Sequence, residues 1–209
     1  MVVTQNTDGL HQRAGTPPDL VVELHGTMHV VICCGCRHRS PTAAVIARIA
    51  AGDPVPQCTH CGGILKTAST MFGQTVAPEV YARAERAVLD CDLVLAAGTT
   101  LTVEPAGSLC ATAIRAGAAL VIANWDPTPY DGIATDIIRD PLSESLPRIA
   151  AQLMAGPQSP PATPQASVSD GTGTGTEPGA VIRRELARLH KSSARQQLAL
   201  TADTAGPRR

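Results

Sequence analysis

Short apolar runs alternate with a helical stretch along the first 155 residues of the chain. Residues 20–24, 93–97 and 118–123 form such runs, and residues 106–115, between the last two, have helical spacing. The two later runs do not alternate with polar residues, which is typical of parallel strands covered on both faces. The pattern therefore predicts an α/β fold with a parallel sheet.

Small and polar residues follow the predicted strands. Gly98, Thr99 and Thr100 come directly after residues 93–97, and Asn124 comes directly after residues 118–123. In open α/β sheets, ligands bind beyond the carboxyl ends of the strands. A strand followed by Gly-Thr-Thr is also a common start of a helix with an N-cap, and a helix amino terminus is a ready site for ribose-phosphate groups. We expect Gly98 and Asn124 to lie at such a ligand-binding edge.

Four of the seven cysteines have the spacing of zinc ligands. They form two C-x-x-C pairs separated by 21 residues: Cys33, Cys36, Cys58 and Cys61. Four thiolates fill the tetrahedral shell of zinc and leave no position for a substrate, so we expect one structural zinc ion. Cys33 is preferred to Cys34 because it preserves the two-residue gap, and His60 is not expected to be a ligand. The alternative is a group of buried or reactive thiols.

These cysteines lie in a predicted insertion of about residues 27–75. The two later cysteines, Cys91 and Cys110, occur in apolar surroundings and are expected in the core. The insertion is therefore predicted to be a small zinc-binding module within the α/β domain.

Charge and composition argue against some classes of partner and indicate where the folded domain ends. The formal net charge is −1, which gives no electrostatic argument for nucleic acid or for a membrane surface. No apolar run approaches the roughly 20 residues that span a bilayer, and polar residues follow Val3 at once, so we expect a cytoplasmic protein.

Residues 156–179 are rich in Pro, Gly, Ser and Thr and predict a disordered linker. Residues 180–209 predict a short basic amphipathic helix and a tail, since apolar residues recur there at helical spacing.

Several short motifs flank the predicted zinc module in a fixed order along the chain. Residues 4–11 read T-Q-N-T-D-G-L-H, residues 23–26 read E-L-H-G, and Cys33 follows His25 by eight residues. With Gly98-Thr99-Thr100 after them, these motifs resemble the sirtuin family, most closely its bacterial members, over roughly residues 2–153. The resemblance implies an NAD-dependent protein-lysine deacylase that acts on an acylated-lysine protein or peptide and releases nicotinamide and O-acyl-ADP-ribose. It also implies an incomplete Rossmann-like sheet within a catalytic domain of residues 1–155.

The resemblance also implies roles for individual residues. His25 and Asn6 would be catalytic, with His25 as the general base toward a ribose hydroxyl. Residues expected to contact NAD are Gln5, Asn6, Asp8, Gly98, Thr99, Thr100 and Asn124. Residues expected to pair, as an extended segment, with the backbone of the substrate peptide are Phe72, Gly73 and Gln74. Judged without the resemblance, the residues of the T-Q-N stretch are turn formers, and an isolated histidine after a strand is more often a packed residue than a catalyst.

Family members carry a G-A-G-x-S loop and a Pro-Asp-Phe-Arg segment before the T-Q-N stretch, and neither motif occurs in the 209 residues. We therefore expect an amino-terminally truncated member. Three explanations stay open: Met1 is an internal position of a longer enzyme, the chain is a decayed or split remnant, or a partner chain supplies the segment. The alternative function is that of a non-catalytic, zinc-stabilised peptide-binding remnant.

Overall fold

The computed structural model of the protein describes residues 1–154, so the predicted linker (156–179) and the predicted basic helix and tail (180–209) lie outside the described residues. The described part divides into two compact units, Met1–Asp90 and a second one that begins at Cys91. In the first unit the elements are β1 (Val2–Thr4), α1 (Leu10–Arg13), η1 (Pro18–Leu20), β2 (Val21–Glu23), β3 (Gly26–Cys33), β4 (Arg39–Pro41), α2 (Thr42–Ala50), β5 (Leu65–Ser69) and α3 (Pro78–Leu89). In the second they are β6 (Leu93–Ala97), α4 (Ala106–Arg115), β7 (Ala119–Ala123), η2 (Asp131–Ile133), β8 (Asp136–Ile138) and α5 (Leu142–Met154).

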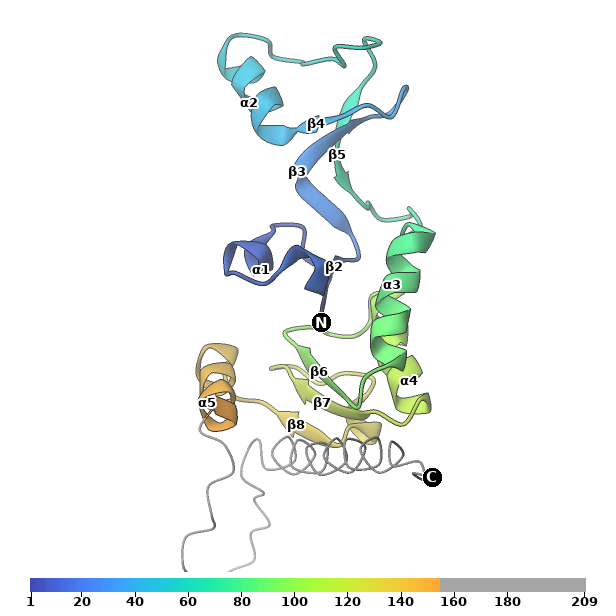
Figure 1. Cartoon of the computed structure of the whole chain (residues 1–209), viewed down its shortest axis with the longest axis vertical. Coiled ribbons are helices and arrows are strands. Elements are labelled where there is room, and N and C mark those ends of the chain that lie inside the picture. The colour runs from blue at the N-terminus through green and yellow to red at the C-terminus, as the bar shows by residue number, and fades with distance from the viewer. Residues whose placement is uncertain (155–209) are drawn as a thin grey trace, which may run out of the picture. The chain divides into compact units, whose positions relative to one another are not determined.

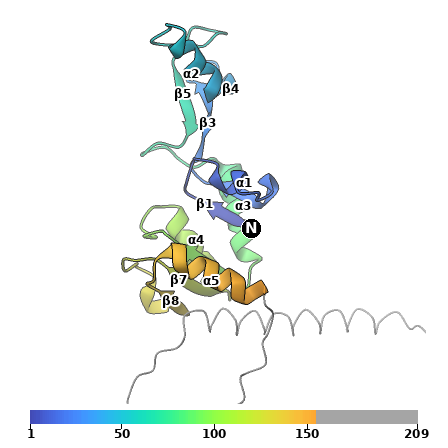
Figure 2. The same cartoon turned by 90° about the vertical axis from the view of Figure 1, so that its left-hand side faces the viewer.

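The second unit is a three-stranded parallel sheet in the order β6-β7-β8, with α4 and α5 on opposite faces (Figures 1 and 2). The side chains of β7 alternate between two apolar clusters. Leu120 and Ile122 pack in a cluster with Cys110 of α4. Residues 121 and 123 pack on the other side of the sheet with Ile149 of α5. Because both faces are covered, the run needs no polar alternation, and the predicted parallel sheet is confirmed.

Strand β6 departs from the expectation of burial on both faces. Of its five residues only Ala96 is buried, and Leu95 is 39% exposed. The physical reason is its position, because β6 is the edge strand of its sheet and has β7 on one side only. An apolar run indicates a strand of this sheet, but it does not distinguish the edge from the centre.

The first unit contains the predicted insertion. Strands β1 and β2 pair in parallel, with Val2 opposite Val21 and Thr4 opposite Glu23. The next three strands form an antiparallel sheet in the order β4-β3-β5, from which α2 projects (Figure 1). This small sheet corresponds to the predicted module of about residues 27–75. The predicted α/β class is therefore confirmed, with the parallel pairs outside the module and the antiparallel sheet inside it. Within the part of the chain that the structure describes, no helix is long and apolar enough to cross a bilayer.

The difference between β7 and β6 gives a test of the fold. Ile122→Ala should lower the free energy of unfolding by about 2–5 kcal/mol, because it empties space at a fully buried position. Leu95→Ala, on the edge strand, should cost less than about 1 kcal/mol. Urea titrations of the two variants beside the unchanged protein measure both values, and equal losses would contradict the assignment of β7 as the central, two-sided strand.

Candidate functional site

The T-Q-N stretch is a loop fixed at its two ends. At its start, the buried Thr4 accepts the Asn6 backbone N–H with its hydroxyl oxygen at 3.1 Å, and the Thr4 carbonyl accepts the Leu24 N–H at 2.9 Å. At its end, a carboxylate oxygen of Asp8 accepts the Leu10 N–H at 3.0 Å. This last bond satisfies a free N–H at the first turn of α1, where Gly9 provides no side-chain cap. The backbone of the loop is therefore set by local bonds and by the pairing of β1 with β2.

His25 lies beside this loop, two residues after the end of β2. Its Nδ1 is 3.2 Å from the Gln5 carbonyl oxygen, which can only accept a hydrogen bond. The proton of the neutral ring is therefore assigned to Nδ1, and Nε2 keeps its lone pair. A partly buried histidine held in this tautomer can accept a proton at Nε2.

The glycine after His25 is required by the close approach of two strands. Gly26 has a φ of +72°, and a Cβ built on it would lie 2.1 Å from the carbonyl oxygen of Ala68 on β5. The His25 carbonyl accepts the Thr70 N–H at 2.7 Å. The backbone of His25 and Gly26 is thus held against the end of β5.

In the second unit, the predicted edge residues do come together. The Gly98 N–H donates to the Ala123 carbonyl at 2.9 Å, so the carboxyl ends of β6 and β7 are adjacent. Asn124 follows β7, is only 9% exposed, and donates its side-chain amide to the Asp126 carbonyl at 2.9 Å. The structure therefore places Gly98 and Asn124 at neighbouring strand ends, as the sequence predicts.

The interpretation of Gly98-Thr99-Thr100 as a helix start is wrong. Helix α4 begins at Ala106 and its N-cap position is Pro105. The two threonine hydroxyls bond within the loop instead: Thr99 accepts the Leu101 N–H at 3.2 Å, and Thr100 bonds the Thr102 hydroxyl at 2.8 Å. The reason is the sharp turn of this loop, in which Gly98 and Leu101 both have positive φ values, of 63° and 57°.

An arginine that sequence reasoning missed holds the loop after β7. Arg139, which follows β8, donates to the carbonyls of Asn124 at 2.8 Å and Asp126 at 2.9 Å and pairs with Asp131. Bonds donated by the hydroxyl and the N–H of Thr128, together with Arg139, hold the pKa of Asp131 below its ordinary value. No local pattern indicates this role, because Arg139 is 15 residues from Asn124 in sequence.

The segment Phe72-Gly73-Gln74 is a turn rather than an extended strand. The Gln74 N–H donates to the Met71 carbonyl at 2.9 Å, and Gly73 has the positive φ, 80°, that such a turn needs. The Gln74 side-chain oxygen accepts the Met71 N–H at 3.0 Å and the Lys66 ammonium at 3.3 Å. Phe72 is fully exposed. The turn leaves this large apolar side chain available to a partner.

The four predicted zinc ligands converge in the antiparallel module. Their sulfur atoms all lie within 4.8 Å of one another, with Cys33 and Cys61 at 3.5 Å and Cys36 and Cys58 at 3.6 Å. Zinc–sulfur bonds of about 2.3 Å in a tetrahedron place sulfurs about 3.8 Å apart, so the site fits zinc. A Cβ on Gly63 would lie 2.9 Å from the Cys33 sulfur, which explains the glycine there.

The choice of ligands also agrees with the structure. Cys34 is exposed and lies outside the cluster, whereas Cys33 is fully buried. His60 does not join the cluster either, and its ring lies against that of His38 with the ring centroids 3.8 Å apart. The four-cysteine set can hold one zinc ion.

Two of the four clustered cysteines have shifted pKa values. The backbone N–H of Cys36 lowers the pKa of Cys33 to about 6. The pKa of Cys36 rises to about 12: the backbone N–H of His38 favours its thiolate, but bonds with the other thiols, Cys61 first, and burial outweigh it. Four thiolates this close would repel one another. A divalent cation compensates that repulsion.

The two remaining cysteines behave differently. Burial raises the pKa of Cys110 to about 11 and also raises the pKa of Cys91, which is only partly buried. Raised pKa values make weak nucleophiles. The prediction that these residues belong to the core therefore holds fully for Cys110 and in part for Cys91.

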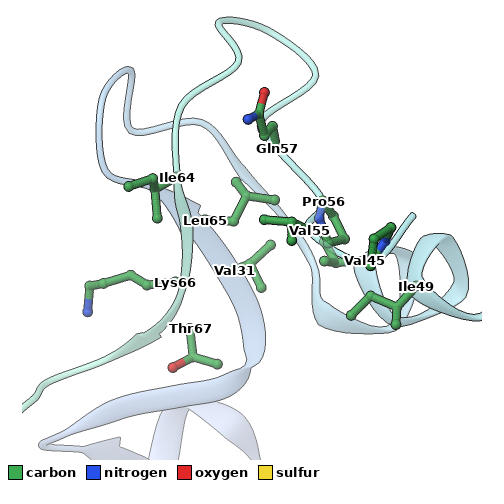
Figure 3. Close-up of a pocket in the computed structure, with 11 residues that line it drawn as sticks. Val31, Val45, Ile49, Val55, Pro56, Gln57, Ile64, Leu65, Lys66 and Thr67 are labelled. Carbon is green, nitrogen blue, oxygen red and sulfur yellow. The ribbon is translucent and has the colours of Figure 1, made fainter. Parts of the chain in front are cut away.

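The module also contains an apolar hollow, lined by residues other than the cysteines. Val31 of β3, Leu65 of β5, and Val45 and Ile49 of α2 line a cavity of about 390 Å³ together with residues 54–57 (Figure 3). Its lining is mainly apolar, and Gln57, Lys66 and Thr67 are its polar members. We describe it as an open part of the core of the module and not as a reaction site.

Replacing a ligand and its neighbour separates metal binding from general thiol chemistry. Cys33→Ser should abolish stoichiometric zinc and lower the melting temperature, because three thiolates and a weak hydroxyl hold zinc poorly. Cys34→Ser, one residue away and outside the cluster, should retain one zinc per chain. Metal analysis of protein purified without chelators measures both, and zinc loss in the Cys34 variant alone would reverse the assignment.

Comparison with known proteins agrees with these features. Residues 1–105 match the model of the Sir2 family. The chain is 48% identical over 148 residues to NAD-dependent protein deacetylase 2 of Streptomyces coelicolor, covering 71% of this chain and 61% of that protein. The chain thus spans less than two thirds of the length of this relative.

Two solved structures have the same fold. A Sir2 structure with a p53 peptide and NAD⁺ superimposes with a TM-score of 0.69 and 31% identity, covering 74% of this chain and 63% of that one. A Sir2 complex with the inhibitor EX-527, 2′-O-acetyl-ADP-ribose and deacetylated p53 peptide gives a TM-score of 0.67 and 31% identity, covering 73% and 64%. The matched family model, the ordered motifs and the four-cysteine module together show that this chain belongs to the Sir2 family, the sirtuins.

Proposed function

We propose that this protein is an NAD-dependent protein-lysine deacylase. The observation that carries the proposal is the bond between His25 Nδ1 and the Gln5 carbonyl, which joins the two motifs and leaves Nε2 able to take a proton. Support also comes from the relatives, because the Streptomyces protein is named a deacetylase and the solved Sir2 complexes hold peptide, NAD⁺ or acetyl-ADP-ribose. These observations favour the enzyme over the non-catalytic remnant.

His25 acts in this proposal as the general base. NAD supplies the ribose carbon to which the acyl oxygen bonds as nicotinamide leaves. His25 Nε2 accepts the proton of a ribose hydroxyl, and the Gln5 carbonyl stabilises the imidazolium through the Nδ1–H. Because that acceptor is a backbone atom, the orientation of the ring depends on the pairing of β1 with β2 rather than on a neighbouring side chain.

The polar residues of the T-Q-N loop bind the nicotinamide riboside part of NAD in this proposal. Gln5 and Asn6 offer amide groups to the ribose hydroxyls, with Asn6 close to the reacting carbon and therefore catalytic. The Asn6 backbone is fixed by Thr4, and its side-chain amide makes no hydrogen bond within the described residues. The Asp8 carboxylate, which already accepts the Leu10 N–H, accepts the amide N–H of the carboxamide with its remaining lone pairs.

The second unit supplies groups for the phosphates and the other ribose. Gly98 has no side chain at a position with positive φ, so its backbone can approach a phosphate closely. Thr99 and Thr100 offer hydroxyls in the same loop, and the Asn124 side-chain oxygen suits a ribose hydroxyl. These donors and acceptors fit the oxygen-rich ligand that the proposal requires.

The substrate in this proposal is a protein or peptide with an acylated lysine. Phe72, Gly73 and Gln74 provide its docking segment, with Phe72 as an exposed apolar contact and the backbone of the turn as hydrogen-bonding partner. Completion of the NAD site by a partner chain and a cytoplasmic location stay predictions.

A pair of substitutions at His25 tests the proposal. His25→Ala should lower peptide-dependent nicotinamide release from NAD by at least about 100-fold, in the range typical of a lost general base. His25→Asn should lose as much, although its side-chain amide can keep the bond to the Gln5 carbonyl. Nicotinamide is measured by chromatography with and without an acetyl-lysine peptide, with zinc content as the control for folding.

The Asn variant separates chemistry from structure. Full activity of His25→Asn would show that the residue only holds the loop, and the proposed base would be wrong. Absence of peptide-dependent release from the unchanged, zinc-loaded protein would overturn the proposed function for this chain.

A further inference from the structure

A second histidine contacts the T-Q-N loop. The Nε2 of His29, near the start of β3, lies 2.7 Å from the Asp8 carbonyl oxygen. That oxygen can only accept, so Nε2–H is the donor. Nothing in the sequence motifs indicates this contact, because His29 lies 21 residues from Asp8.

The contact exists because β3 leaves its partner strand at this point. The register between β3 and β5 shifts between Thr27 and Val31, so the residues between them have no partner on β5. The Met28 N–H is thereby free to donate to the Thr7 carbonyl at 3.0 Å, and the His29 ring reaches the next peptide. Two successive residues of β3 thus bind two successive carbonyls of the loop.

The ring of His29 also packs against the turn. Gly9 has a φ of +66°, and a Cβ built on it would lie 3.0 Å from His29 Nε2 and 3.1 Å from Cδ2. The absence of a side chain at Gly9 therefore lets the imidazole lie close to the backbone. Asp8 is then held at two points, its carbonyl by His29 and its carboxylate by the Leu10 N–H.

We propose that His29 is a positioning residue that fixes the direction of the Asp8 carboxylate in the nicotinamide pocket. This inference rests on the proposed function, which gives Asp8 the carboxamide. On either side, the Thr7 carbonyl accepts the Met28 N–H at 3.0 Å and the Gly9 carbonyl accepts the Arg13 N–H at 3.1 Å, whereas the bond to the Asp8 carbonyl comes from His29. Loss of the His29 bond lets the Asp8–Gly9 peptide rotate, and the carboxylate then spends less time in the orientation that binds nicotinamide.

Three variants of the full, zinc-loaded chain test the inference. His29→Ala removes the donor. His29→Gln restores one, because the glutamine amide nitrogen is the same number of bonds from Cα as His Nε2. Met28→Ala is the matched control, since it shortens an exposed neighbouring side chain and keeps the backbone bond to Thr7.

Two readouts are needed. Amide hydrogen exchange of Leu10, followed by NMR, reports whether the Asp8 turn is held, independently of activity. Affinity for nicotinamide and the KM for NAD, compared with kcat, report whether the turn matters for binding. In His29→Ala we expect Leu10 exchange and nicotinamide Kd to rise about 3- to 10-fold, the size expected for one hydrogen bond, with kcat changed less than about 2-fold. His29→Gln should recover most of both losses, and Met28→Ala should match the unchanged protein.

The two measurements test the structural and the functional role of His29 separately. Equal Leu10 exchange in the His29→Ala, Met28→Ala and unchanged proteins would overturn the claim that His29 holds the turn. Faster exchange with unaltered nicotinamide affinity would overturn its role in the site. If the unchanged protein binds no nicotinamide, the proposed function fails, while the exchange measurement still decides whether His29 fixes the turn.

Discussion

The parallel pairing of β1 with β2 is the constraint on which the candidate active site depends. Each strand has only three residues, yet their register aligns Thr4 with Glu23, so Gln5, directly after β1, and His25, two residues after β2, lie side by side. The bond from His25 Nδ1 to the Gln5 carbonyl follows from that register. A slip of one residue would reverse the faces of the strand and remove the bond. The chemistry assigned to His25 is thus a consequence of backbone pairing.

The zinc module extends this constraint. Strand β3 begins directly after His25 and ends at the ligand Cys33, and its partner β5 follows the second cysteine pair. A metal that holds the two cysteine pairs together also holds the far ends of both strands. The near ends then meet at Gly26 and Ala68, where only a glycine fits. The same strands change register in between, which frees Met28 and His29 to bind the T-Q-N loop. The module is therefore connected to the candidate site through the backbone of β3.

In the second unit, the residues at the carboxyl ends of the strands are held in place by a different set of interactions. Its central strand β7 is buried on both faces, so it offers ligands only its carboxyl end, where Asn124 stands beside Gly98. Arg139 and Asp131 then fix the loop beyond Asn124 through charged hydrogen bonds. Such bonds, together with the packing of Tyr130 against the apolar cluster of Leu120 and Ile122, give this loop a defined shape.

The parts of this protein that depend on local pattern could be predicted from the chain alone. The apolar runs predicted the parallel sheet, helix 106–115 agrees with α4, and the cysteine spacing predicted the right four of seven thiols, because two-residue gaps fit a chelating turn. The ordered motifs predicted the family and pointed to His25. Features that depend on contacts between distant residues became known from the three-dimensional structure. They are the edge position of β6, the turn at Phe72–Gln74, the loop in place of a helix start after Gly98, and the contacts of Arg139 and His29. The physical reason is that strand order, register shifts and side-chain hydrogen bonds across 15 or 21 residues leave no periodic signal in the chain.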